Sequence, residues 1–223
     1  MKSDLSILHQ DEHLVVVAKP ARLLSVRAPG SDEPCVADVL AERGIDARPV
    51  HRLDREVSGA MILALDDATQ AKLEDAFRAR AVRKTYWALA QGRVRPAQAT
   101  LRQPIIEEAS FARVSARGKE AITRYRTLES LPASTVVEVE IATGRYNQIR
   151  VHFAHAGFPL VGERKYARGK DSPVRAPSRR VALHAWRLAF PHPATGALLE
   201  IEAPLAQDLV ELRAQAARPI RRR

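Results

Sequence analysis

The stretch VHRLDREVSG, residues 50–59, leads directly into the apolar run AMILAL, residues 60–65. An uninterrupted apolar run of this length is typical of a buried β-strand. The preceding residues place a histidine, two arginines and an aspartate within positions 51–55. We therefore predict a core strand that is preceded by a loop with clustered charges. Loops of this kind commonly hold catalytic or binding residues.

Around this strand, short segments with β-like alternation outnumber the helical segments. The spacing of apolar residues predicts helices over 35–43 and 68–81, with Asp67 as the N-cap of the second. It also predicts a short helix that packs Ile149 and Phe153 and ends near Gly157, and a terminal helix over 205–216. Further strands are predicted over 5–9, 14–18, 84–91, 99–106, 112–115, 121–128, 136–141, 182–190 and 198–202. Many strands with few helices between them indicate an α+β fold, with a mixed, mainly antiparallel β-sheet flanked by helices.

The domain organisation follows from length and composition. The 223 residues contain no repeat and no linker that would divide them, so we expect one domain over residues 1–217. A basic tail over residues 218–223 is expected to be disordered. Cys35 is the only cysteine, which excludes an intrachain disulfide and fits a reducing, cytoplasmic setting.

The charge balance points to a polyanionic partner. Lysine and arginine number 36 against 26 acids, which gives a net charge of +10. A protein that is merely basic remains the alternative. The basic residues group in two places, over 78–84 and over 164–180. No run approaches the roughly 20 apolar residues of a membrane span, and no signal peptide is recognisable.

Three residues are candidates for a chemical site. Asp54 lies between arginines that favour its ionised form, so it suits a nucleophile or a general base. Arg150 follows a glycine turn and could pair with Asp54 or bind phosphate. Tyr86 could stack on a base, as recognition of single-stranded RNA often requires. The alternatives are a structural ion pair for Asp54, a surface arginine, and a tyrosine packed in the core.

The sequence does not favour a metal or a nucleotide cofactor. His51, His152 and His155 occur without an HExxH or CxxC pattern and without a helix rich in carboxylates. The chain also lacks the glycine-rich motifs that cradle nucleotide phosphates. We therefore expect no metal and no cofactor.

Five stretches, taken in order, resemble the RluA-type pseudouridine synthases. They span about residues 5–204, nearly the whole chain. They are Ile7–Pro20 with Leu23–Val26, His51–Asp54 with Ser58 and Gly59, Arg83–Tyr86 with Ala88, Gly144 and Arg145 with Gln148–His152, Gly157, Pro159 and Gly162, and finally Leu183–Ala185.

The resemblance implies a pseudouridine synthase fold and an isomerase that converts specific uridines in ribosomal or transfer RNA, with no cofactor. Many members of this family carry an S4-like RNA-binding domain in front of the catalytic domain, and we expect no N-terminal S4 domain here. Asp54 would be the catalytic carboxylate, acting on a uridine flipped out of its stack. Tyr86 would stack on the uracil, Arg150 would pair with Asp54, and Arg52 would fill the space that the base leaves. We also place Ile149 at the substrate site.

RNA phosphates would meet basic side chains, and we expect the enzyme to act as a monomer. The expected RNA-binding residues are Arg83, Lys84, Arg164, Lys165 and Arg168. Four positions depart from the family pattern: Val57 stands where a threonine is usual, Asn147 where a histidine, Glu163 where an aspartate, and Arg22 where a glycine.

Two other readings stay open. The first is a non-catalytic RNA-binding or ribosome-assembly factor that keeps the same fold. The second is a nucleoside glycosidase, which would need a second acid beside Asp54, and Glu56 is the near candidate.

Overall fold

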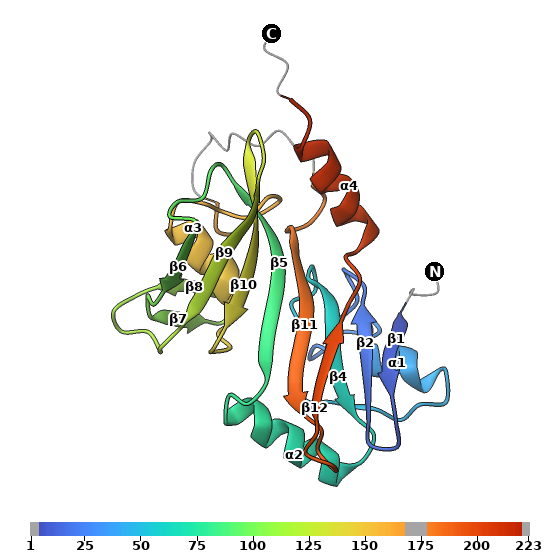
Figure 1. Ribbon diagram of the computed structural model, residues 1–223. Coiled ribbons are helices and arrows are strands. Elements are labelled where there is room, and N and C mark those ends of the chain that lie inside the picture. Colours follow the sequence, from blue (N-terminus) through green and yellow to red (C-terminus); the bar gives the residue numbers. More distant parts are fainter. Residues whose placement is uncertain (1–4, 168–177, 220–223) are drawn as a thin grey trace. The chain divides into compact units, whose positions relative to one another are not determined.

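The computed structural model describes residues 5–167 and 178–219 (Figure 1). The chain forms two compact units. One contains Met1–Lys84 and His184–Ala206, and the other contains Thr85–Leu183 and Gln207–Arg223. The expectation of a single domain over residues 1–217 stays a prediction, and residues 220–223 of the predicted tail lie outside the described residues.

The sheet of the first unit runs in the order β1-β2-β4-β11, with β3 paired to β4 and β12 paired to β11. Its strands are β1 (Ser6–Gln10), β2 (Leu14–Lys19), β3 (Arg48–Pro49), β4 (Ser58–Ala64), β11 (Leu183–Pro191) and β12 (Leu198–Glu202). These pairs are antiparallel except for β4 with β11, which is parallel. The predicted apolar run therefore forms β4, between β2 and β11, and every residue of β4 is buried.

Two helices belong to this unit, α1 (Val36–Ala41) and α2 (Asp67–Arg78). The N-cap of α2 is Asp66, so the prediction of Asp67 was wrong by one residue. The Asp66 carboxylate accepts hydrogen bonds from the backbone N–H and the hydroxyl of Thr69, at 2.8 and 2.7 Å. This side-chain bond satisfies a donor that the first turn of a helix cannot pair internally.

The core of this unit lies between the sheet and α2. Figure 1 shows α2 across the ends of β4, β11 and β12. Leu73 of α2 is fully buried, and the helix packs Phe77 against the same cluster. Side chains of the sheet, including Leu14, Ile62 and Phe190, complete the cluster. The alternation of β2 and the apolar run of β4 thus produce the packed layer that supports the loop before β4.

The second unit orders its strands β5-β10-β9-β6 and carries a separate hairpin, β7-β8. Its strands are β5 (Arg83–Gln91, whose first two residues belong to the first unit), β6 (Gln98–Leu101), β7 (Ile105–Glu108), β8 (Phe111–Val114), β9 (Thr123–Ser130) and β10 (Ser134–Ile141). The helices are α3 (Gln148–His155) and α4 (Gln207–Ala216). The strand predicted over 99–106 is in fact two strands, because the chain leaves β6 at Leu101 and Pro104 separates it from β7.

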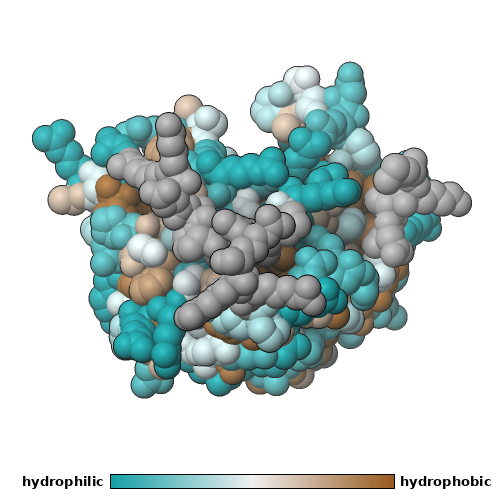
Figure 2. Space-filling view, turned by 90° about the horizontal axis from the view of Figure 1, so that it is seen from above, coloured by the Kyte–Doolittle hydropathy of each residue, from teal (hydrophilic) through white to brown (hydrophobic). Residues whose placement is uncertain are grey.

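These elements confirm the predicted fold class of a mixed, mainly antiparallel sheet with flanking helices. Among residues 5–167 and 178–219, no helix combines the length and the apolar character needed to cross a membrane. In the view from above, hydrophilic residues cover much of the described surface, with hydrophobic residues scattered among them (Figure 2). Such a surface agrees with the high content of charged residues.

Gly59 is required where β4 meets β11. It pairs with Ala185 at a φ of +120°, and a Cβ placed there would lie 2.1 Å from the Ala185 carbonyl oxygen. We predict that Gly59→Ala lowers the free energy of unfolding by roughly 3 kcal/mol or more, since strain and a backbone clash add. Gly196→Ala is the control, because Gly196 also has positive φ but no atom lies within 4 Å of its Cβ position. We expect Gly196→Ala to lower the free energy of unfolding by about 1–2 kcal/mol. Urea unfolding measures the free energy of unfolding of both variants. Equal decreases in Gly59→Ala and Gly196→Ala would contradict a role for the close packing of Gly59 against Ala185.

Candidate active site

Asp54 lies in the loop between β3 and β4, and the backbone of this loop is held from both sides. The Ser25 hydroxyl accepts a hydrogen bond from Leu53 N–H at 2.9 Å and donates one to Leu53 C=O at 2.8 Å. On the other side, Val57 N–H donates to the Asp54 carbonyl at 3.0 Å. Asp54 is half-buried and Arg52 is exposed. The loop therefore presents the carboxylate from a fixed backbone.

A buried lysine ties this loop to the chain that follows β2. Lys19 is 1% exposed, and its ammonium group donates to the carbonyls of Pro20, Leu23 and Arg55 at 3.0, 2.8 and 3.4 Å. The three acceptors match the three N–H donors of a lysine ammonium group. Sequence reasoning missed this function of Lys19. The available signal was a charged residue at the end of an apolar strand, where charge is rarely buried without partners.

His51 and Arg55 had no role in the sequence prediction, and both are structural here. His51 Nε2 accepts a hydrogen bond from Ile62 N–H at 2.9 Å, and its ring stacks on Phe77 at 4.6 Å. Burial and the positive charge of Lys84 lower the pKa of His51 to about 3. His51 is therefore neutral and supports β4. Arg55 forms an ion pair with Glu33 at 2.5 Å, so its side chain also fastens the loop.

Tyr86 and Trp87 are neighbours on β5, and both rings are buried, at 9% and 6% exposure. Strand alternation directs the two side chains to opposite faces. The burial of Tyr86 gives the ring a fixed environment.

Arg150 is in the first turn of α3, which begins after Asn147, and its side chain is 8% exposed. Its Nε and Nη2 donate to the two carboxylate oxygens of Glu163 at 2.7 and 3.0 Å, and Nη1 donates to Asn147 Oδ1 at 3.3 Å. Ile149, which precedes Arg150, is 4% exposed. The predicted pairing of Arg150 with Asp54 stays a prediction. The sequence did not identify Glu163 as a partner of Arg150.

Glu163 is ionised because its partners outweigh its burial. Burial raises the pKa of Glu163, but the hydrogen bonds and charge of Arg150 and the backbone N–H groups of Lys165 and Tyr166 lower it further, so the net shift is downward. The carboxylate is fully buried. Arg150 and Glu163 therefore form a bidentate pair of opposite charges, the arrangement in which a guanidinium plane is held most firmly.

The predicted RNA-binding residues differ in whether their charged groups already contact other residues of the protein. Arg83 pairs with Glu200 at 2.7 Å. Lys84 lies over the Phe77 ring. The pKa of Lys84 is lowered, first by burial and second by the positive charge of Arg80. Arg164 is exposed and makes no hydrogen bond or ion pair with the described residues.

Lys165 contacts the β7-β8 hairpin and three aromatic rings. Its ammonium group donates to the Ser110 carbonyl and lies 4.9 Å from the centre of the Tyr146 ring, with Phe111 and Tyr166 somewhat farther away. This lysine therefore has a packing role as well as a charge. The remaining predicted residue, Arg168, lies outside the described residues.

The candidate residues group by unit. Arg52 and Asp54 share one loop of the first unit, and Lys84 adjoins this loop through the Phe77–His51 stack. Arg150 and Lys165 are linked in the second unit, because Lys165 N–H and Arg150 both bond to Glu163. In the described part of the chain, no group of three or more His, Cys, Asp or Glu residues has a geometry that would hold a metal ion.

The chain is similar to several known proteins over most of its length. The family model described as RNA pseudouridylate synthase matches residues 13–155. An uncharacterized RNA pseudouridine synthase of Mycobacterium bovis is 37% identical over 218 residues, which are 92% of this chain and 70% of that protein. Ribosomal large subunit pseudouridine synthase D of Pseudomonas aeruginosa is 36% identical over 228 residues, 94% of this chain and 71% of that protein.

The solved structure of human RNA pseudouridylate synthase domain containing 4 has a TM-score of 0.78 and 27% identity, and covers 95% of this chain and 92% of its own. The chain belongs to the RNA pseudouridylate synthase family. It is an RluA-type RNA pseudouridine synthase, an intramolecular isomerase that acts on RNA. The resemblance that the sequence motifs indicated is confirmed.

His51 should make the stability of this synthase depend on pH. The unfolded chain takes up a proton on this histidine near pH 6.5, whereas the folded protein resists protonation until about pH 3. The free energy of unfolding should therefore fall as the pH drops below about 6.5, with a contribution from His51 of at most about 1.4 kcal/mol per pH unit.

In His51→Gln, we predict lower stability at pH 7 but a flatter dependence between pH 5 and 6.5, where most carboxylates stay ionised. Urea unfolding at several pH values measures this slope. A slope equal to that of the unsubstituted protein would contradict the assignment of His51 as the buried neutral histidine.

Proposed function

We propose that this synthase isomerises specific uridines in ribosomal RNA, transfer RNA or both, with Asp54 as the catalytic carboxylate on a flipped-out uridine. The observation that carries the proposal is the fixed backbone around Asp54, held by Ser25 on one side and by Val57 on the other. A carboxylate on such a loop keeps its position when the substrate binds. Pre-positioned groups of this kind supply much of an enzyme's rate enhancement.

The reaction breaks the N1–C1′ bond of uridine and forms a C5–C1′ bond. C5 then loses its proton, and N1 gains one, so no atom is added or removed overall. Asp54 either attacks C1′ directly or removes the C2′ proton to give a glycal. Tyr86 stacks on the uracil and assists removal of the C5 proton. Ile149 contributes an apolar contact at the same site.

Arg150 is proposed to keep Asp54 ionised and correctly oriented. Its burial and its bond to Glu163 support a fixed guanidinium plane. Arg52 is proposed to fill the space left by the flipped base. Its exposure, and its lack of a hydrogen bond or ion pair with residues 5–167 and 178–219, support a side chain available to the RNA. Flipping costs on the order of a few kcal/mol, which such an insertion partly offsets.

Two relatives support ribosomal RNA as one of the proposed substrates. The proteins from Pseudomonas aeruginosa and Escherichia coli are both named ribosomal large subunit pseudouridine synthase D, and they are 36% and 34% identical to this chain. The enzyme is proposed to act as a monomer in the cytoplasm, in keeping with its single cysteine and its basic charge.

Asp54→Asn should abolish the reaction. The probe is RNA from a host strain that lacks the gene, grown on uridine tritiated at C5, so that each turnover releases tritium. We expect the rate to fall by about 10³-fold or more, with folding and RNA binding retained. Glu56→Gln is the matched control, because a glycosidase with paired carboxylates would need this second acid. Near-normal tritium release by Asp54→Asn, or loss of release in Glu56→Gln, would contradict the proposed chemistry.

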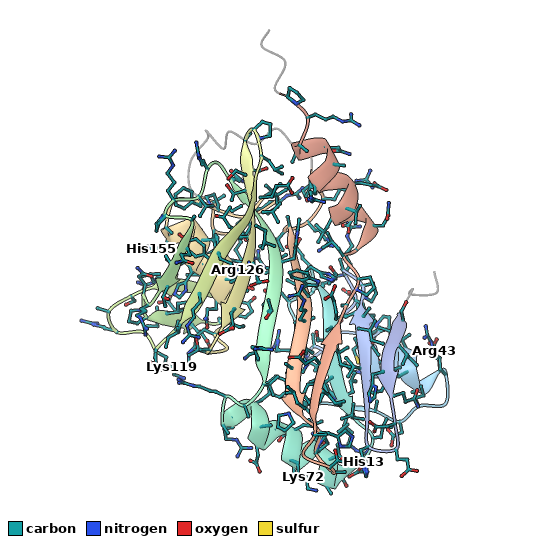
Figure 3. The ribbon with its side chains drawn as sticks, in the orientation of Figure 1. His13, Arg43, Lys72, Lys119, Arg126 and His155 are labelled. Atoms are coloured by element: carbon teal, nitrogen blue, oxygen red, sulfur yellow. The ribbon has the colours of Figure 1, made fainter. Side chains whose placement is uncertain are left out.

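Arg164 is the clearest candidate for a direct phosphate contact. In Arg164→Ala, the slope of log binding constant against log salt concentration should become shallower by about 0.7, the value for one phosphate contact on single-stranded RNA. Arg126, labelled in Figure 3, is the control because its guanidinium is already bonded to both oxygens of Glu138, at 2.7 and 2.9 Å. Filter binding to the same RNA measures both variants. Equal slopes in Arg164→Ala and the unsubstituted enzyme would rule out the contact.

A further inference from the structure

Arg150 is held by two neighbouring side chains. Glu163 and Asn147 each accept a hydrogen bond from the Arg150 guanidinium. Together they engage Nε, Nη1 and Nη2, so every nitrogen of the group has one of these bonds. The guanidinium group is therefore held at all three of its nitrogens.

Glu163 is itself fixed by the backbone around it. Its Oε1 accepts hydrogen bonds from the N–H groups of Lys165 and Tyr166, at 2.8 and 3.2 Å. Its own N–H donates to the Leu160 carbonyl at 3.0 Å. The preceding Gly162 has a φ of +79°, and a Cβ there would lie 2.0 Å from the Arg180 carbonyl oxygen. The carboxylate thus has little freedom to turn or to move away from Arg150.

Asn147 takes a backbone conformation that few residues tolerate. Its φ is 53° and its ψ is 27°, in the left-handed region where asparagine and histidine are both enriched. The side chain bridges two groups, because Oδ1 accepts from Arg150 and Nδ2 donates to the Tyr166 hydroxyl at 2.7 Å. Arg150 also lies over the Tyr166 ring, 5.5 Å from its centre. Asn147 and Tyr166 therefore limit the guanidinium from the side that Glu163 leaves open.

We propose that Glu163, assisted by Asn147, is a positioning residue for pseudouridine formation: it sets the plane of the Arg150 guanidinium that orients the catalytic carboxylate. The proposal rests on the role of Arg150 given under Proposed function. A bidentate contact fixes the rotation of a guanidinium group as well as its position, which a single hydrogen bond cannot do. Displacement of a catalytic group by about 1 Å can cost roughly 10²-fold in rate.

The test uses single-turnover tritium release with enzyme in excess over the C5-tritiated RNA from the deletion strain. In Glu163→Gln, which preserves size but removes the charge and one acceptor, we expect the saturating rate to fall about 10²-fold. The enzyme concentration at half-saturation should change by less than about twofold, because Glu163 acts through Arg150 and not through the RNA. Glu163→Asp should recover a large part of the rate, because it restores the charge and the two acceptors.

Asp208→Asn is the matched control. Asp208 forms a bidentate contact with the buried Arg180 in the same unit, at 2.6 and 2.8 Å, and has no proposed part in the reaction. The loss of this contact should leave the saturating rate unchanged. A loss of rate in Asp208→Asn equal to that in Glu163→Gln would show that breaking any bidentate contact to a buried arginine in this unit is sufficient, and would overturn the proposal.

A second comparison separates positioning from folding. If Glu163 acts only through Arg150, Glu163→Gln should add no further loss of rate in an Arg150→Lys background, where the bidentate contact cannot form. Additive losses would overturn the proposal. Should Glu163→Gln fail to fold, Asn147→Gly serves as the second variant. It removes the hydrogen bond between Arg150 Nη1 and Asn147 Oδ1, and glycine adopts the positive φ without strain. We expect the saturating rate to fall roughly tenfold, with half-saturation unchanged. An unchanged rate in that variant would also overturn it.

The outcome also distinguishes this proposal from the one on which it rests. Full activity in Asp54→Asn would refute the catalytic assignment. Loss of activity in Asp54→Asn and Arg150→Lys, with full activity in Glu163→Gln, would refute only the positioning role of Glu163.

Discussion

The loop that carries Asp54 depends on one buried ammonium group. Lys19 ends a strand whose first four residues are packed in the core, and its three N–H donors reach three carbonyl oxygens. An isolated buried charge would be strongly unfavourable, so these bonds fix the chain as well as satisfying the lysine. Since two acceptors follow β2 and the third is on Arg55, the ammonium group joins the segment after β2 to the loop that carries Asp54. Ser25 then holds Leu53, the neighbour of Asp54.

The second unit also contains buried charge that is satisfied by hydrogen bonds, but here two opposite charges form a pair. The side chains of Arg150 and Glu163 are both nearly excluded from solvent. Two hydrogen bonds, donated by Arg150 and accepted by Glu163, join them. A buried ion pair gives little stability compared with an apolar packing of similar volume, but removal of one partner leaves an uncompensated charge. Such a pair is therefore better explained by the orientation it imposes than by the stability it provides. The basic side chains that are exposed nearby, such as Arg164, bear no comparable constraint.

The sequence predicted the elements whose signal is local. The apolar run of β4, the alternation of β10 and the turn at 193–196 between β11 and β12 gave strands where the structure has them. The boundaries were less reliable, because Asp66 and Asp67 are both good N-caps and only the position of Thr69 selects the first. The roles of His51 and Glu163 could not be predicted, since their partners Ile62, Phe77 and Arg150 come from other elements.

Arg22 has a backbone conformation that is unusual for a residue with a side chain. It has a φ of 73°, a conformation that a glycine adopts without strain and that costs other residues about 1–2 kcal/mol. Its N–H donates to the Arg55 carbonyl at 2.6 Å, and its own carbonyl accepts from Arg55 Nε at 3.3 Å. These bonds help to offset the strain, and they add a further link between the two segments that Lys19 joins.

The central claim is that this chain converts particular uridines in cellular RNA, and mapping of pseudouridines in total RNA tests it most directly. Maps from the host strain, from a strain without the gene and from that strain supplied again with the gene should be compared at single-nucleotide resolution. The account predicts one or a few positions, in ribosomal or transfer RNA, that lose pseudouridine without the gene and regain it on its return. Identical maps from all three strains would contradict the account.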